Sequence, residues 1–259
     1  MRPRLGPCSP ACACLQGCGS GSHPGVSPTH VDDRDCVTIG VEFSSAARNN
    51  ELQLHLIVPN TPIVSRAIEY ARENCEPYLF NHSMRSWLFA VVIAQQKHAM
   101  YDPEVLAVAT LLHDIGLARA FNGPLRFEVE GANAARAFAR GQGMMERNAQ
   151  LVWDGVALNS TPSIALYKEG EVALCTMGIG VDWGGWGIDL LTQTQVATIL
   201  ETFPRLEMKQ RFTRDVCRIV ESRPGTTYDN FARDFGERFV PGYAPPSTVD
   251  FLLNSPFKE

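Results

Sequence analysis

A histidine and an aspartate stand side by side in TLLHDIGLA, residues 110–118, at the end of an apolar run. His113 falls on the helical face of Leu106 and Ala109, which predicts an inward-pointing imidazole. Asp114 follows about 100° further round a helix, so both side chains can reach one point. A buried carboxylate is costly to keep ionised without a cation or several donors, so the pair indicates a metal site. The alternative is that Asp114 only hydrogen-bonds His113 or caps a neighbouring helix.

Two more residues can complete a metal-binding set. His82 opens the apolar segment NHSMRSWLFAVVIAQQKH, and helical bundles often hold a metal with one imidazole from each of two packed helices. No histidine follows His113, so a ligand from the C-terminal half has to be a carboxylate or a cysteine. Asp182 in MGIGVDWGGWGID is the best candidate, with a helix cap or turn aspartate as the alternative. Two His and two Asp suit one zinc or iron ion better than calcium, which prefers oxygen ligands.

The elements that must position these side chains read as helices. Thr-Pro at 61–62 and Asp-Pro at 102–103 are typical helix starts, because proline fits the first helical position. The run from Trp87 to Ala94 is apolar on nearly every side, which predicts a central helix, and Gly116 is expected to end the helix that carries His113. Further helices are expected at 127–140, 144–160, 171–178, 194–203, 204–222 and 228–239. Strand-like alternation occurs only in CVTIGVEF and LQLHLIV, so the sequence predicts an all-α bundle without internal repeats.

Composition and charge narrow the remaining classes of protein. The chain has 259 residues, 45% of them hydrophobic and 20% charged, which fits a single globular domain that we assign to residues 46–259. The net charge is −5 and the basic residues are scattered, which argues against a nucleic-acid partner. No apolar stretch approaches the ~20 residues of a membrane span, and a secretory signal core is lacking. We therefore expect a cytoplasmic protein without a membrane partner.

The first 45 residues differ in composition from the rest. They hold the cysteines at positions 8, 12, 14, 18 and 36, and the segment CSPACACLQGCGSGSHPG matches no specific zinc pattern. Its glycine, serine and proline content favours a disordered tail over a thiolate metal clip joined by His23 or His30.

Four segments in order resemble the HD-domain superfamily and its cyanamide hydratase-like branch, common in fungi. These segments are NHSMRSW, ATLLHDIGL, FEVEGANAARAF and the stretch from Val152 to Gly185. The resemblance covers roughly residues 62–241 and implies an all-α HD fold with one metal, usually zinc or iron. Its implied ligands are the first-motif histidine, the HD pair and a distal aspartate, which in this chain are His82, His113, Asp114 and Asp182. They are the same four residues that the chemistry favours.

The chain departs from that family at two places. Phosphohydrolase members often carry a lysine three residues after the HD aspartate, where this chain has Leu117, so phosphate chemistry loses a charge partner. Relatives read AIALHT where this chain reads GVALNS, which puts Asn159 in the place of a histidine. An amide can hydrogen-bond but cannot titrate near neutral pH. Either Asn159 preserves a hydrogen bond and activity persists, or turnover is lost.

The sequence favours a metal-dependent hydratase or hydrolase of a small nitrogenous compound, with cyanamide as the model substrate and urea as its product. A bound ion would activate water or polarise the substrate. We assign catalytic roles to Asp114, Asn159 and Thr161, the last two as groups that orient the substrate. The resemblance leaves homo-oligomer formation open.

Two other functions compete with this one. A nucleotide phosphohydrolase should show convergent cations, yet only Arg85, Arg119 and Arg126 lie near the motifs. A degenerate HD protein would keep the metal, or bind a small molecule, without turnover.

Three further residues have two interpretations each. Glu128 is either an acceptor that fixes a ligand histidine or an ordinary carboxylate at a helix N-terminus. Trp183 and Trp186 either wall a small pocket over the metal or simply pack.

Overall fold

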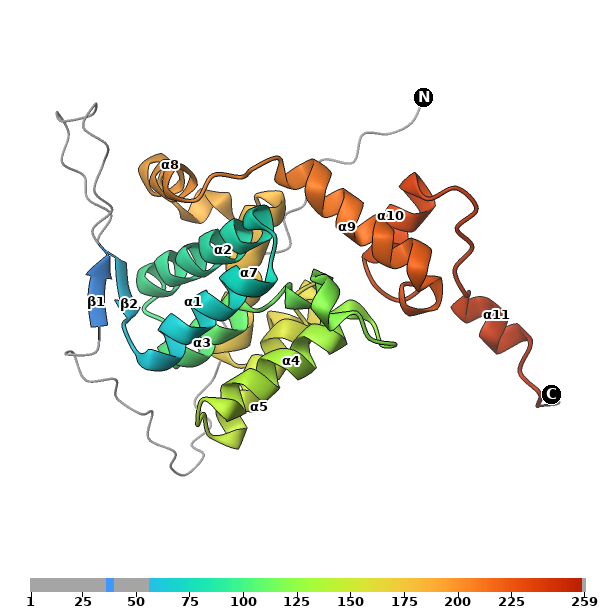
Figure 1. The fold of residues 1–259 in the computed structure, drawn as a ribbon, viewed down its shortest axis with the longest axis horizontal. Coiled ribbons are helices and arrows are strands. Elements are labelled where there is room, and N and C mark those ends of the chain that lie inside the picture. The colour runs from blue at the N-terminus through green and yellow to red at the C-terminus, as the bar shows by residue number, and fades with distance from the viewer. Residues whose placement is uncertain (1–35, 40–55, 258–259) are drawn as a thin grey trace.

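The computed structural model describes residues 36–39 and 56–257, and these form an all-α fold, as predicted (Figure 1). The helices in chain order are α1 (Pro62–Asn74), α2 (Pro77–Gln96), α3 (Pro103–Leu111), α4 (Phe127–Gly141), α5 (Glu146–Ala157), α6 (Pro162–Ala165), α7 (Gly170–Gly184), α8 (Gln193–Thr202), α9 (Met208–Ser222), α10 (Ala232–Phe239) and α11 (Thr248–Leu253). Strand β1 (Cys36–Ile39) pairs antiparallel with β2 (Leu56–Pro59), with Cys36 opposite Pro59. Strand β1 lies within CVTIGVEF, and β2 overlaps LQLHLIV and extends one residue beyond it, to Pro59.

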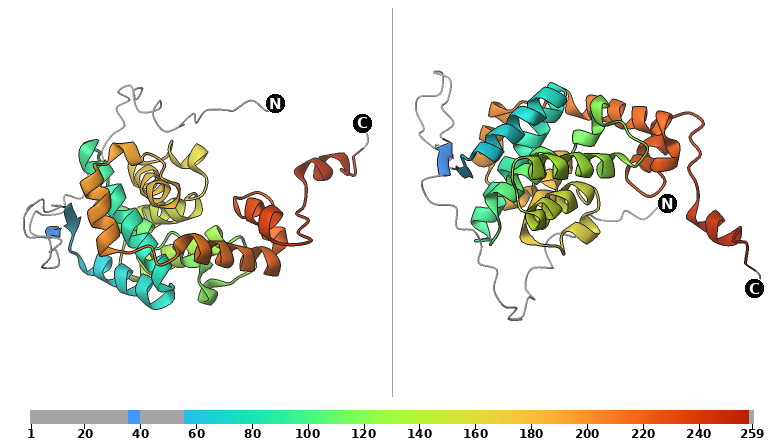
Figure 2. Two further views of the ribbon diagram at one scale, coloured as in Figure 1. Left: turned by 90° about the horizontal axis from the view of Figure 1, so that it is seen from above. Right: turned by 60° about the horizontal axis from the view of Figure 1, so that its bottom comes forward.

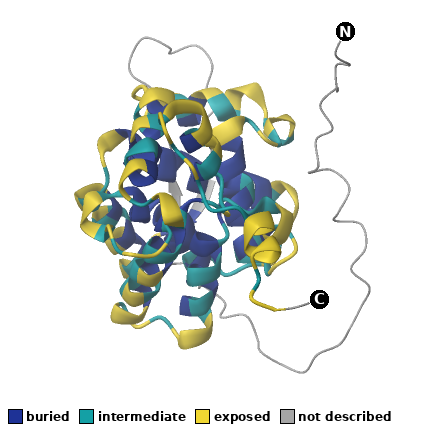
Figure 3. Ribbon diagram, turned by 90° about the vertical axis from the view of Figure 1, so that its right-hand side faces the viewer, coloured by how far each residue is buried: buried dark blue, intermediate teal, exposed yellow. Residues whose placement is uncertain are grey.

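Helix α2 is the central element of the bundle. Every residue from His82 to Ala94 is buried, which confirms the prediction from the all-round apolar run. Figure 3 shows the buried residues at the centre of the bundle and exposed residues around it. The helix packs along α7 and also contacts α3 and α9. A side chain that leaves α2 in any direction therefore meets another helix, so the polar residues of α2 must find partners inside the protein.

A glycine lets α2 and α7 pack closely. A Cβ atom on Gly178 would overlap the backbone carbonyl of Ser86 and crowd the backbone nitrogen of Ala90, so only glycine fits there without a shift of the helices. The expectation that this helix ends at Gly178 is wrong, because α7 continues to Gly184. Gly178 provides a close contact, and the turn comes later, at Gly185 and Gly187, which have positive φ, so Asp182 lies inside the helix.

The HD pair lies beyond the end of α3, not in its last turn. The helix stops at Leu111, and a short 3₁₀ turn at Ile115–Leu117 follows, so the expected continuation to Gly116 is wrong. The imidazole of His113 explains the early end, because its Nδ1 contacts the Thr110 carbonyl at 2.8 Å, where the amide of Asp114 would bond in a continuing helix. The start of the helix is as predicted, with the Asp102 side chain accepting from two backbone amides.

The C-terminal helices extend the bundle on one side. Helix α10 packs on α9, whose apolar face joins Tyr78 of α2 and Phe127 of α4 in a second, smaller core. Helix α11 lies apart from the bundle in both views of Figure 2. Helices α9 and α10 begin four residues later than predicted, at Met208 and Ala232.

The predicted tail, residues 1–45, lies outside the described residues apart from β1. The division at residue 45 and the single domain that follows it stay predictions. Among the described residues, no helix combines the length and hydropathy needed to cross a membrane.

Candidate metal centre

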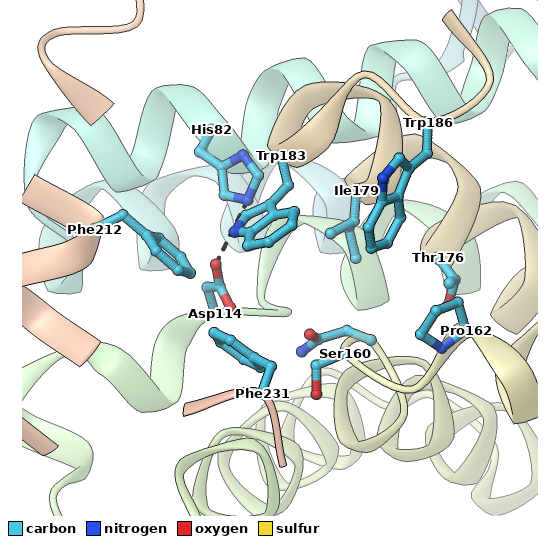
Figure 4. A pocket seen from close by; sticks show the side chains of 12 residues that line it. His82, Asp114, Ser160, Pro162, Thr176, Ile179, Trp183, Trp186, Phe212 and Phe231 are labelled. Carbon is cyan, nitrogen blue, oxygen red and sulfur yellow. Dashed lines mark ion pairs between the residues drawn. The ribbon is translucent and has the colours of Figure 1, made fainter. Parts of the chain in front are cut away.

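Three ligand atoms converge where α2 meets the turn after α3. The Nε2 atoms of His82 and His113 lie 3.1 Å apart. The Oδ2 atom of Asp114 lies 3.5 Å from His82 Nε2 and 3.2 Å from His113 Nε2. All three side chains are buried, and Figure 4 shows His82 and Asp114 facing each other. Among the described residues, this is the group whose ligand atoms lie close enough together to hold a metal ion.

The second nitrogen of each imidazole fixes its tautomer. His82 Nδ1 lies 2.6 Å from an Asp182 carboxylate oxygen, and His113 Nδ1 lies 2.8 Å from the Thr110 carbonyl oxygen. Both partners can only accept, so each Nδ1 carries the hydrogen and each neutral ring turns an Nε2 lone pair toward the other. Two lone pairs and a carboxylate this close together repel one another unless a cation lies between them. The donor set therefore fits a divalent metal ion.

The charges around the two imidazoles differ in effect. Burial lowers the pKa of His82 despite the neighbouring carboxylates. Burial also opposes the charged form of His113, but the adjacent Asp114 carboxylate outweighs it and raises the pKa of His113 above its usual value. The pKa of Asp114 is lowered, because the attraction of His113 exceeds the cost of burial. Without a metal, a proton on His113 takes the place of the cation, so protons and metal compete for this site.

Asp182 contacts the opposite edge of the His82 ring. Its carboxylate accepts two hydrogen bonds from Arg85, from Nε at 2.7 Å and from Nη2 at 2.7 Å, and one from Arg205 at 3.0 Å. Burial acts to raise the pKa of Asp182, but the hydrogen bonds and charges of His82 and Arg85 hold it well below the usual range. Asp182 is absent from the group of converging ligand atoms among the described residues. That it coordinates the metal stays a prediction, and its contacts favour the orientation of His82.

Arg85 is a site residue whose role sequence reasoning missed. It is fully buried and also donates to the carbonyls of Phe203 and Pro204 at 2.9 and 3.1 Å. The sequence suggested Arg85 only as a phosphate partner. Its spacing of three residues from His82 on one helix was a usable signal, because residues three apart are neighbours on a helix surface.

A cavity of ≈ 70 Å³ opens beside the converging atoms (Figure 4). Trp183 and Trp186 line it, as one of the two interpretations of these residues predicts, and their ring centroids are 5.5 Å apart. The residues that line it are His82, Asp114, Asn159, Ser160, Pro162, Thr176, Ile179, Gly180, Trp183, Trp186, Phe212 and Phe231. None of these lining residues is a lysine or an arginine.

Of the two residues predicted to orient substrate, the structure brings one to the cavity. Asn159 lines it, and its amide nitrogen donates to the carbonyls of His113 at 3.0 Å and Val156 at 2.8 Å. Only the amide oxygen is left for a ligand, because an amide has two hydrogens. Thr161 precedes α6 and is not among the residues that line the cavity, whereas its neighbour Ser160 is.

Glu128 does not contact the imidazoles. It is fully buried in the first turn of α4 and accepts from Arg126 and from Ser160 Oγ at 2.9 Å. The imidazoles use Asp182 and the Thr110 carbonyl instead, so the interpretation of Glu128 as the acceptor that fixes a ligand histidine is not supported.

The part of the chain that holds these residues is similar to a known protein family. Residues 79–175 match the family described as HD domain, a match that includes His82, His113, Asp114 and Asn159. No curated protein matches the sequence. HD domains bind divalent metals and belong to a superfamily of metal-dependent hydrolases, and the buried His82, His113 and Asp114 could hold such a metal. Residues 79–175 are therefore similar to the HD domain, and His113 and Asp114 of the candidate metal centre lie within the matched region.

Proposed function

We propose that the protein is a metal-dependent hydratase or hydrolase of a small, uncharged nitrogenous compound, with cyanamide as the model substrate. The observation that carries the proposal is the convergence of two imidazole lone pairs and one carboxylate on the wall of a cavity that no lysine or arginine lines. Cyanamide-like chemistry is the finer part of the proposal and comes from the sequence resemblance.

The residues present suit one zinc or iron ion. Two imidazole nitrogens and one carboxylate oxygen are typical ligands of these metals, and three protein ligands leave a coordination position open, as catalytic sites require. A bound ion would supply a water of lowered pKa or polarise a substrate atom. Asp182 would hold His82 through its Nδ1 hydrogen, and Arg85 and Arg205 would keep Asp182 ionised.

Asp114 and Asn159 would have different roles toward the substrate. Asp114 is the carboxylate that lines the cavity, so a proton that moves to or from the substrate would move through it. Asn159 cannot transfer a proton near neutral pH, and its amide oxygen would accept a hydrogen bond from substrate. A role for Thr161 stays a prediction.

A phosphohydrolase fits the site less well. Phosphate recognition calls for cations that converge on the reacting group. Arg85 is committed to Asp182 and to two carbonyls, and Arg126 is committed to Glu128. Cyanamide, in contrast, is uncharged and needs no such partner.

The proposal is tested by metal content and turnover together. Purified wild type should contain one equivalent of metal and release urea from cyanamide but no phosphate from a nucleotide panel. His113→Ala should lose both metal and activity, and His98→Ala, which changes an exposed histidine, should lose neither. A folded wild type without metal would overturn the proposal, and phosphate release without urea release would favour the phosphohydrolase.

Asn159→His separates an active enzyme from a degenerate one. If wild type binds metal but turns over nothing, and Asn159→His restores urea release, catalysis has been lost at this position. If wild type is active and the variant gains little, the amide supports the reaction.

A further inference from the structure

Thr176 carries a buried hydroxyl that the protein itself does not use. It lies on α7, is 4% exposed, lines the cavity, and its Oγ1 has no hydrogen-bond partner. Helical threonines usually bond the carbonyl four residues earlier. Thr110, Thr202 and Thr213 do so in this protein, at 2.7, 2.8 and 2.7 Å. A buried hydroxyl without a partner costs free energy, so the Thr176 hydroxyl, which faces a cavity, needs an explanation.

Asn159 and Ser160, which also line the cavity, already donate their side-chain hydrogens to the protein. Both amide hydrogens of Asn159 go to backbone carbonyls, and the hydroxyl hydrogen of Ser160 goes to Glu128. Trp183 and Trp186 are partly exposed, at 38% and 54% of their surface, whereas Thr176 is 4% exposed. Of the three neutral side chains Asn159, Ser160 and Thr176, only Thr176 keeps a free hydrogen to donate to a ligand.

The rest of the cavity wall is apolar and carries no positive side chain. Trp183 lies 6.5 Å from Phe212 and 6.3 Å from Phe231 between ring centroids, and Ile179 adds an aliphatic surface. The Asp114 carboxylate repels an anion, and no lysine or arginine among the lining residues offsets it. The volume of ≈ 70 Å³ is about half of the ~150 Å³ cavity that holds benzene in an engineered protein, which limits the ligand to a few non-hydrogen atoms.

We infer that Thr176 is a specificity-determining residue that donates a hydrogen bond to the oxygen or nitrogen of a short-chain uncharged amide or nitrile, whose alkyl group lies against the aromatic wall. The inference rests on the proposed function for the identity of the site and deepens it by naming the substrate class.

The test compares propionamide with propionate, which have the same size and differ in charge. Binding is measured by quenching of tryptophan fluorescence, to which Trp183 and Trp186 contribute from the cavity wall. The protein is titrated both as purified and after chelation, because a carboxylate can also bind a metal directly. Wild type should bind propionamide and reject propionate in the chelated protein.

Three variants isolate the hydroxyl. Thr176→Val keeps the shape and should weaken propionamide binding about 3- to 10-fold, the usual effect of one lost hydrogen bond, and Thr176→Ser should restore it. Thr176→Val should leave the melting temperature unchanged or raise it, because it removes an unpaired buried hydroxyl. Thr202→Val is the matched control, because Thr202 does not line the cavity and its hydroxyl donates to the Thr198 carbonyl; it should leave propionamide binding unchanged and should not raise the melting temperature.

Four results would overturn the inference. They are wild-type affinity in Thr176→Val, a melting temperature that falls in that variant, propionate binding as tight as propionamide binding in the chelated protein, and the absence of saturable quenching by propionamide. A wild type that lacks metal would refute the proposed function alone, because the titration of the chelated protein still decides the role of Thr176.

Discussion

Replacing Arg85 by methionine should test how much the hydrogen bonds from Arg85 to Asp182 stabilise the protein around the metal centre. Arg85 is fully buried and makes two hydrogen bonds of 2.7 Å to Asp182 and two longer ones to backbone carbonyls. Methionine fills similar space without donors, so Asp182 would keep only His82 and Arg205 as partners. The Arg205 side chain is 34% exposed and cannot replace a buried bidentate partner.

The expected loss in free energy of unfolding is about 3–5 kcal/mol, the usual effect of removing one member of a buried ion pair. The loss comes mainly from the Asp182 carboxylate left under-compensated in the interior, together with the Phe203 carbonyl, which loses its donor. The Pro204 carbonyl keeps a hydrogen bond from Asn81. A domain with a total stability of about 5–15 kcal/mol should survive it and remain measurable.

Urea denaturation of wild type, Arg85→Met and Arg85→Lys measures the effect. Arg85→Lys keeps the charge but not the paired hydrogen bonds, so its loss should be intermediate. The double variant Arg85→Met/Asp182→Leu should be more stable than the sum of the single losses predicts, because no buried charge is left unpaired.

The pH dependence of the Arg85→Met effect has a definite sign. The folded-state pKa of Asp182 is lowered, so its stabilising contribution is present above the unfolded value of about 3.9 and is lost as the pH falls toward the folded value. The difference in stability between wild type and Arg85→Met should therefore be largest above about pH 4 and shrink below it. A loss under about 1 kcal/mol at neutral pH, or a gap that does not shrink in acid, would refute the reasoning.

Three other predictions follow from the packing and the charges. Gly178→Ala should cost about 2–3 kcal/mol in urea denaturation, because its Cβ would overlap the backbone of α2, whereas Gly141→Ala, with open space around its Cβ, should be neutral or stabilising; equal effects would contradict this. At pH 8, iodoacetamide should modify the partly exposed Cys217 faster than the buried Cys175, because burial raises the pKa of Cys175 to about 12. Peptide mass mapping of the folded protein measures both rates, and equal rates would contradict this prediction. Metal affinity should fall as the pH drops through the raised pKa of His113, since the proton competes with the ion, and a pH-independent affinity by competition titration would count against the site.

The sequence predicts the fold class and the convergence of His82 with the HD pair. Helix starts at Pro62 and Pro103 were predictable because proline strongly favours the first helical position. The preceding Asp102 side chain caps its helix, whereas the Thr61 side chain makes no cap hydrogen bond. The apolar run of α2 identified the central helix because nothing but burial explains it. These signals depend on neighbouring residues alone.

The arrangement around His82 was not predictable in the same way. Glycines before and after Asp182 read as a turn, but Gly178 serves a close approach to α2 that lies far away in sequence. The end of α3 depends on the His113 side chain taking the Thr110 carbonyl, which no periodicity reveals. Packing differences of a few ångströms decide which of the two imidazole nitrogens a carboxylate contacts. Asp182 shows this, because the sequence predicts its nearness to His82 but not its side of the ring.

Metal binding by wild type, Asp114→Ala and Asp182→Asn, measured as equivalents per folded chain and dissociation constant, tests the metal centre most directly. Wild type should bind one equivalent, Asp114→Ala should bind none, and Asp182→Asn should still bind one with an affinity roughly 10- to 100-fold lower, as for a residue that orients a ligand. A wild type that binds no metal, or an Asp182→Asn variant that loses it as completely as Asp114→Ala, would contradict a centre built on His82, His113 and Asp114.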